Sequence, residues 1–119
     1  MARAERSGAE HSHSASFDTA VRILGPRWTL IIIHRLSIRP RRFGELRHSL
    51  GDVSSRILSD RLQLLESEGL VKRISYREVP PRVVYELTEA GRSVRPVLEA
   101  LASWGKRHAQ AGSSKSRSE

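Results

Sequence analysis

One segment of the chain, Leu50–Leu70, contains the signals for a turn, for the start of a helix and for the end of that helix. Gly51 and Asp52 are typical of a turn, and the two serines that follow at 54 and 55 can cap the first backbone amides of a helix. Gly69 permits the backbone conformation that ends a helix. We therefore predict a helix of about four turns over residues 54–67, which the rest of the chain must support.

The two sides of this predicted helix differ in chemistry. When the residues are placed at about 100° each, one side carries aliphatic residues that should pack on a core, namely Ile57, Leu58, Leu62 and Leu65. The opposite side carries side chains that can hydrogen-bond to base edges and phosphates, namely Ser55, Arg56, Ser59, Asp60 and Gln63. A polar face is also the ordinary property of a solvated helix. The rest of the sequence has to decide between these two interpretations.

The charge of the chain favours a polyanionic partner. Its 119 residues suffice for one domain with a single core, and they include 21 lysines and arginines against 13 acidic residues. The formal net charge is +8 and the sequence pI is about 11.2. Most of the cations are arginines, whose planar fork suits phosphates and guanine edges. Charge alone leaves open a genomic preference for arginine or binding to a membrane surface.

The sequence contains no cysteine, which excludes disulfides, thiolate metal sites and thiol redox switches within these residues. No apolar run approaches the roughly 20 residues that a membrane-spanning helix needs, and the first residues lack the apolar core of a signal peptide. We therefore expect a soluble cytoplasmic protein with no membrane partner.

Residues 1–16 are polar and without periodicity, so we expect a flexible N-terminal arm. The arm contains His11 and His13, a pair of the kind that can bind a metal. A structural zinc site normally uses a full tetrahedral set of ligands, and no further ligands cluster nearby in the sequence. A solvated arm is therefore the favoured interpretation, and no metal site is predicted.

Three helices are expected between this arm and the turn at Gly51-Asp52. Apolar residues at helical spacing begin at Phe17, and Gly25-Pro26 ends that pattern. The apolar run 28–36 fits a buried strand or a buried helix, and the breaks on both sides of it favour a helix. A basic connector over 39–42 then precedes a short helical pattern over Phe43–Leu50. With the turn and the helix over 54–67, this forms a helix-turn-helix whose second helix would enter the major groove.

A β-hairpin is predicted after Gly69. Residues 70–76 and 82–87 favour strands, and Pro80-Pro81 stiffens the connection between them. Four cations lie on this small hairpin, which suits a wing placed along the DNA backbone or in the minor groove: Lys72, Arg73, Arg77 and Arg82.

The last predicted helix begins near Thr88, which can cap it, and it carries an apolar stripe that includes Leu98, Leu101 and Trp104. Pro96 either kinks this helix or lies in the first turn of a new one. Residues 109–119 are expected to form a flexible tail. The predicted fold is therefore mainly α with a small β-hairpin (α+β), a winged helix-turn-helix domain over residues 17–108.

These features resemble the HxlR-type winged helix-turn-helix transcriptional regulators, which are related to the MarR group. The resemblance covers roughly residues 17–105. It is carried by seven stretches in order, namely LGPRW (24–28), RFGELR (42–47), LSDRL (58–62), EGLV (68–71), VPPRV (79–83), YELT (85–88) and GR (91–92).

The resemblance implies a homodimer, held by its first and last helices, that binds a double-stranded DNA operator and most often represses transcription. Carried over by position, the base readers would lie between Ser54 and Gln63, phosphate contacts would come from Arg41, Arg42 and Arg47, and the wing with Arg82 would reach the backbone or the minor groove. Their positive charge makes Arg73 and Arg77 of the same hairpin further candidates for contact with DNA. The dimer interface would include Phe17, Val21, Leu98, Leu101 and Trp104. Alternatively, the apolar stripe of the last helix could close the core of its own subunit and take no part in a dimer interface.

The sequence departs from the family at Ala15, where many relatives carry a cysteine. Thiol sensing of quinones, aldehydes or oxidants is therefore not expected, and any effector would be an unknown small molecule or a partner.

Two other function classes compete with the DNA-binding one. A winged-helix module could bind an acidic protein or RNA, but protein interfaces centre on aromatic and aliphatic anchors, which we do not expect on the polar face of 54–67. An enzyme would need a nucleophile, a phosphate loop or a metal triad, and none is recognisable. Ser54 and Ser55 are better explained by helix capping, and His34 by a place at the core boundary. We predict no enzymatic activity and no cofactor.

Overall fold

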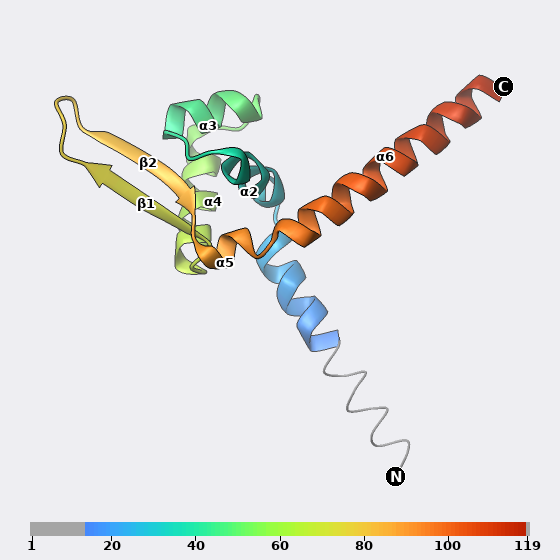
Figure 1. Ribbon diagram of the computed structural model, residues 1–119, viewed down its shortest axis with the longest axis horizontal. Helices are drawn as coiled ribbons and strands as arrows, with labels where there is room; N and C mark the ends of the chain where they lie inside the picture. The colour runs from blue at the N-terminus through green and yellow to red at the C-terminus, as the bar shows by residue number, and fades with distance from the viewer. Residues whose placement is uncertain (1–13, 119) are drawn as a thin grey trace, which may run out of the picture.

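The computed structural model describes residues 14–118, with side chains described for 14–112. It is rich in helix and contains a two-stranded antiparallel sheet, the architecture of a winged helix-turn-helix (Figure 1). The predicted fold class is confirmed. In chain order the elements are a helix over 14–24, α2 (Thr29–Ile38), α3 (Phe43–Leu50), α4 (Ser55–Ser67), β1 (Val71–Tyr76), β2 (Arg82–Leu87), α5 (Glu89–Arg92) and α6 (Arg95–Ser118).

The helix α2 lies at the centre of the core. Its side chains Ile32, Ile33 and Leu36 are buried, which accounts for the nearly continuous apolar run in the sequence. The helical interpretation of this run is confirmed, since α2 spans Thr29–Ile38 and follows the break at Gly25-Pro26 after two intervening residues. Aliphatic side chains from α3, the turn after it, α4 and both strands extend the core, namely Leu46, Leu50, Val53, Leu58, Leu62, Leu65, Val71 and Leu87.

The helix-turn-helix pair lies where the sequence predicts it. Val53 is buried beneath the turn between α3 and α4, and Arg47 Nε donates a hydrogen bond of 3.1 Å to the Val53 carbonyl oxygen. Ser54 Oγ accepts a hydrogen bond of 3.1 Å from the Ile57 amide, so this serine caps α4. Contacts inside the motif therefore set the geometry of the turn.

The sheet is a hairpin with an additional edge contact. β1 and β2 pair with Tyr76 opposite Arg82. We call both strands and the tip 77–81 the wing, and residues 39–42 the connector. Arg41 of the connector pairs with Tyr85 of β2 through two backbone hydrogen bonds, of 3.0 Å from the Arg41 amide and 2.8 Å from the Tyr85 amide. The connector thus extends the wing sheet by a single residue.

The chain passes from the wing to α6 through a tight junction at α5. Thr88 Oγ1 accepts a hydrogen bond of 3.1 Å from the Gly91 amide, which confirms the predicted cap. A Cβ atom at position 91 would lie 2.1 Å from the Leu70 carbonyl oxygen, so this position requires glycine. Pro96 lies in the first turn of α6, and of the two alternatives for this proline the start of a new helix is the one found.

Both terminal helices are longer than predicted. The described part of the first helix starts at residue 14 and so includes residues 14–16 of the expected arm, and α6 continues to Ser118 through most of the expected tail of 109–119. These ends project from the body and lack the apolar periodicity on which the prediction depended (Figure 1). His11 and His13 lie outside the described residues. Within residues 14–118, no helix is long and apolar enough to span a membrane.

Candidate nucleic-acid interface

The helix α4 presents a polar face to solvent because its opposite face is held by the core. Leu58, Leu62 and Leu65 are almost completely buried. The other side carries the exposed side chains of Arg56, Asp60 and Gln63. Of the remaining predicted readers on this helix, Ser55 is exposed and Ser59 is half-buried. Among the residues that the structure describes, no ion pair engages Arg56 or Asp60, so both are available to a ligand.

Two residues near the start of α4 were predicted in more than one way or wrongly. Ser54 was expected both as a helix cap and as a base reader, and the structure confirms the cap: its hydroxyl oxygen accepts a hydrogen bond from the Ile57 amide. Ile57, expected on the core side, is 39% exposed, and that prediction is wrong. One residue corresponds to about 100° on a helix, so Ile57 cannot share the centre of the apolar face with its neighbour Leu58. An exposed aliphatic group here can contact a thymine methyl.

The connector and α3 carry further basic groups. Arg42 is exposed, and its backbone amide donates a hydrogen bond of 2.9 Å to Glu45 Oε1. Arg39 Nη1 lies 3.3 Å from Glu45 Oε2. The hydrogen bond from the Arg42 amide, followed by the charge of Arg39, lowers the pKa of the Glu45 carboxyl below its ordinary value. Arg47 is exposed although its Nε anchors the turn, so the rest of its guanidinium can still meet a phosphate.

Arg41 is the predicted phosphate contact that is most engaged within the protein. Its side chain is half-buried, and its Nε donates a hydrogen bond of 3.2 Å to the Arg35 carbonyl oxygen near the end of α2. Together with its backbone pairing to Tyr85, this contact makes Arg41 a joint between α2 and the wing.

Two of the four cations on the wing form ion pairs within the protein, and the other two are exposed without one in the described part of the chain. Lys72 forms an ion pair of 3.0 Å with Glu86, and Arg82 forms one of 3.2 Å with Glu78. The Arg82 guanidinium also stacks 4.2 Å from the centre of the Tyr76 ring, so this arginine supports the wing from within. Arg73 and Arg77 are both exposed, and neither has an ion pair within the described part of the chain. The sequence also gave no reason to select Val79, which is completely exposed at the tip.

Connector and wing face each other across a cleft of about 340 Å³. Its basic side is formed by Arg39, Arg41, Arg42 and Arg82. Four guanidinium groups around one concave surface form a site of the right charge for a phosphate group. The acidic groups in the same cleft, Glu45 and Glu86, are already paired with Arg39 and Lys72.

Comparison with known proteins identifies the family. A family model described as HxlR-like helix-turn-helix matches residues 23–113. The chain belongs to this HxlR-like family. A helix-turn-helix transcriptional regulator of Halalkalibacterium halodurans is 37% identical over 107 residues, which are 88% of this chain and 95% of the relative. The HxlR-like chain is therefore a helix-turn-helix transcriptional regulator.

Solved structures show the same fold for this HxlR-like chain. A MarR-family transcriptional regulator from Enterococcus faecalis V583 has a TM-score of 0.74 at 36% identity, over 84% of this chain and 91% of that one. The redox regulator HypR in its reduced form has a TM-score of 0.77 at 30% identity, over 83% and 98% of the two chains. HypR is described as a redox regulator, whereas the present sequence contains no cysteine.

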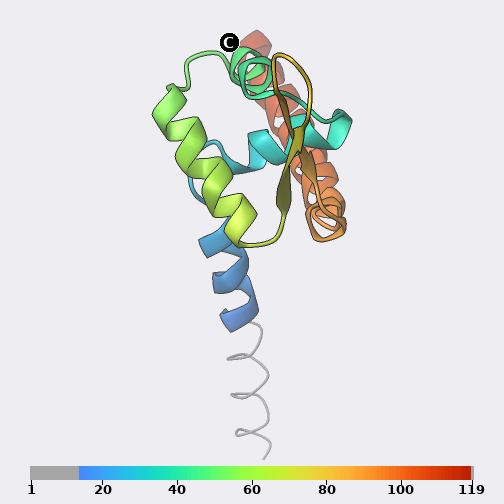
Figure 2. The same cartoon turned by 90° about the vertical axis from the view of Figure 1, so that its left-hand side faces the viewer.

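The terminal helices of the HxlR-like chain carry apolar side chains that its own core does not cover. Phe17 is 63% exposed and Trp104 is 57% exposed, and Val21 and Leu101 are similar. Leu98 differs from these four because it is half-buried against the core of its own subunit. The helix α6 extends from the body on the side opposite the hairpin (Figure 1), and α4 and α6 lie on different sides of the hairpin in Figure 2. The exposed apolar surface of α6 is therefore separate from the basic face.

Proposed function

We propose that this HxlR-like chain is a homodimeric, sequence-specific DNA-binding protein of the cytoplasm that represses transcription by occupying an operator. The observation that carries this proposal is the polar face of α4. Arg56, Asp60 and Gln63 are exposed on a helix whose opposite face is buried in the core, and further exposed basic groups lie on α3 and on the wing. This is the arrangement that base recognition in a major groove requires.

In this proposal the side chains on α4 read the bases. Arg56 donates two hydrogen bonds to a guanine, and Asp60, one turn further along the helix, either accepts from a cytosine amine or orients Arg56. Gln63 suits an adenine edge, and Ile57 contacts a thymine methyl. Sequence preference should therefore be concentrated in the base pairs that face these four residues.

The proposed phosphate contacts come from two parts of the chain. Arg42 precedes α3 and Arg47 lies on it, while Arg73 and Arg77 lie on the wing, and all four are exposed. Each contact displaces condensed counterions, so the logarithm of affinity should fall linearly with the logarithm of salt concentration. Arg41 and Arg82 contribute mainly by holding the connector and the wing in position, because their side chains are engaged inside the protein.

Dimerisation is supported by the uncovered apolar groups on the first and last helices. Side chains such as Phe17 and Trp104 are rarely left in water without a partner surface. A two-fold dimer would place the two α4 helices in successive major grooves, about 34 Å apart or a multiple of that distance. Sedimentation equilibrium tests this part: a monomer at all concentrations would refute the dimer.

The function is tested by measuring binding to the promoter fragment next to this gene and to a random fragment of equal length, over a series of salt concentrations. We expect about a thousandfold preference for the promoter fragment, and footprinting then gives the half-site spacing. Equal and steeply salt-dependent binding to both fragments would refute operator recognition at this site. Absence of binding to either fragment would refute the DNA-binding function and favour a protein or RNA partner.

A further inference from the structure

The tip of the wing carries the most exposed large apolar side chain in the described part of the chain. Val79 is completely exposed, whereas the next in order, Phe17 on the first helix, is 63% exposed. Pro80 and Pro81 follow Val79 and are exposed as well. In Figure 1 this tip is the end of the hairpin that lies away from the core. Val79 therefore packs on none of the described residues, and its exposure calls for another explanation.

The small size of this apolar tip limits what it can contact. A protein partner typically covers about 800 Å² of each surface and centres on large anchors such as tryptophan or tyrosine. One valine with two prolines offers much less, and the Tyr76 ring at the end of β1 is already stacked on the Arg82 guanidinium at 4.2 Å. The minor groove of DNA is about 6 Å wide, and its walls are deoxyribose rings that present C–H groups. A narrow apolar tip matches such a groove.

The charges next to Val79 permit an approach to DNA. The Glu78 carboxylate precedes it directly and would be repelled by phosphates if it were free. Arg82 neutralises this carboxylate through an ion pair of 3.2 Å. Arg77, the residue before Glu78, is exposed and has no ion pair among the described residues. One cation at the tip is thus left to meet a phosphate at the edge of the groove.

The tip is also held in one shape before any DNA binds. Each of the two successive prolines fixes its own backbone φ angle, and the ion pair between Glu78 and Arg82 spans the tip. The Arg82 guanidinium is held in turn by the Tyr76 ring. A preorganised tip loses little conformational freedom when it enters a groove, so more of the contact free energy contributes to affinity.

The fold places the tip where one duplex can contact both it and α4. In Figure 2 the tip of the wing and the capped start of α4 lie at the same end of the molecule. In the proposed function that end of α4 enters the major groove. The adjacent minor groove is then the part of the same duplex that the wing can reach.

We propose that Val79 enters the minor groove beside each half-site and selects base pairs that carry no guanine amino group at that position. Every G·C pair places the guanine N2 amino group in the minor groove, whereas an A·T pair places only acceptors there. A valine side chain accepts no hydrogen bond, so it would cover the amino group and leave a donor unsatisfied. The inference rests on the proposed function and adds to it a base preference that an apolar residue of the wing determines.

The first experiment varies the DNA. In the operator duplex defined by footprinting, each base pair that flanks the half-sites is set in turn to A·T, to inosine·cytosine or to G·C, and affinity is measured by fluorescence anisotropy. Inosine·cytosine resembles G·C in the major groove but lacks the amino group in the minor groove. We expect one flanking position in each half-site where G·C lowers the affinity about tenfold and inosine·cytosine changes it by less than about twofold. A position read in the major groove would respond alike to both replacements.

The second experiment varies the tip. Val79→Ser supplies a hydroxyl that can accept a hydrogen bond from the guanine amino group, so the preference for A·T over G·C should fall from about tenfold to below about twofold. The urea midpoint should stay unchanged because Val79 is completely exposed, and the salt slope should stay unchanged because no charge is removed. Ile38→Ser is the matched control: it removes an exposed aliphatic side chain at the end of α2, outside the wing, and should keep the parental preference.

The outcomes separate this inference from the proposed function. The role of Val79 is overturned if the parent chain tolerates G·C at every flanking position, if inosine·cytosine costs as much affinity as G·C, or if Val79→Ser keeps the parental preference. In each of these cases selective binding of the operator over random DNA leaves the proposed function intact. A parent chain that binds operator and random DNA equally would refute the proposed function, and the inference about Val79 would be refuted with it.

Discussion

Replacement of Arg56 by alanine separates base reading from general attraction to DNA. Arg56 is exposed on α4, and no ion pair holds it within the described part of the chain. Its removal should therefore change the free energy of unfolding by less than about 0.5 kcal/mol. Loss of a bidentate contact to guanine should cost about 1 to 3 kcal/mol in operator binding, which is about 5- to 150-fold in affinity.

Fluorescence anisotropy with an operator duplex and a random duplex, over a series of salt concentrations, provides the assay. Arg56→Lys keeps the charge but loses the planar fork, so it should bind random DNA like the parent chain and still lose operator affinity. Arg77→Ala is the matched control on the wing tip: it should weaken both duplexes alike and reduce the salt slope by about 1. An equal effect of Arg56→Ala on both duplexes would refute base reading by this residue.

Three further predictions concern stability and assembly. Ser54→Ala should lower the free energy of unfolding by about 1 kcal/mol through loss of the α4 cap, as measured in urea; a Ser55→Ala variant that loses as much would contradict the capping explanation. Leu101→Glu should give a monomer in sedimentation equilibrium, and a persistent dimer would place the interface elsewhere. The Glu45 pKa is lowered from 4.5, chiefly by the hydrogen bond from the Arg42 amide, so this carboxylate stabilises the fold above about pH 4.5 and less as pH falls through its lower folded pKa. Thermal unfolding of Glu45→Gln should lack this acid-dependent part, and an unchanged pH profile would contradict it.

The helices and strands at the centre of the chain were predicted well, because turn residues and prolines next to them in the sequence determine where they begin and end. The bounds of α3 and β2 agree with the expected residues, since each is delimited by a turn or by prolines. The apolar run at 28–36 could not be assigned by periodicity alone, and the breaks on both sides of it identified the helix. The extra turns at the chain ends carried no signal, because a helix that packs on nothing needs no apolar stripe.

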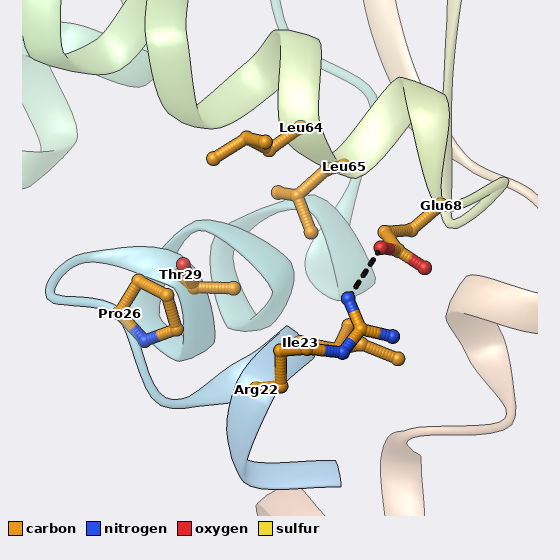
Figure 3. A pocket seen from close by; sticks show the side chains of 7 residues that line it. All are labelled: Arg22, Ile23, Pro26, Thr29, Leu64, Leu65 and Glu68. Atoms are coloured by element: carbon orange, nitrogen blue, oxygen red, sulfur yellow. Dashed lines mark hydrogen bonds and ion pairs between the residues drawn. The ribbon is translucent and has the colours of Figure 1, made fainter. Parts of the chain in front are cut away.

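The candidate site was predicted less completely, because tertiary contacts decide which arginines are free. Sequence alone treats Arg41, Arg77 and Arg82 as equivalent cations. In the structure the Arg82 guanidinium stacks on the Tyr76 ring and forms an ion pair with Glu78. Arg41 donates a hydrogen bond to the Arg35 carbonyl oxygen, whereas Arg77 is exposed. A cavity lined by residues of 22–29 and 64–68 (Figure 3) was equally hidden, since these two stretches lie far apart in the sequence. Such groupings appear only once the chain has folded.

The backbone pairing between Arg41 and Tyr85 has a consequence for how the protein can adapt to different operators. It fastens the wing to the segment that leads into α3, so the two parts cannot swing independently to follow the grooves. A reading surface of this kind presents a constant distance between its groove-directed helix and its wing. The DNA must then deform to fit the protein. Operators whose base steps bend easily, or whose minor groove narrows at low energy, would be preferred even where no side chain touches the bases.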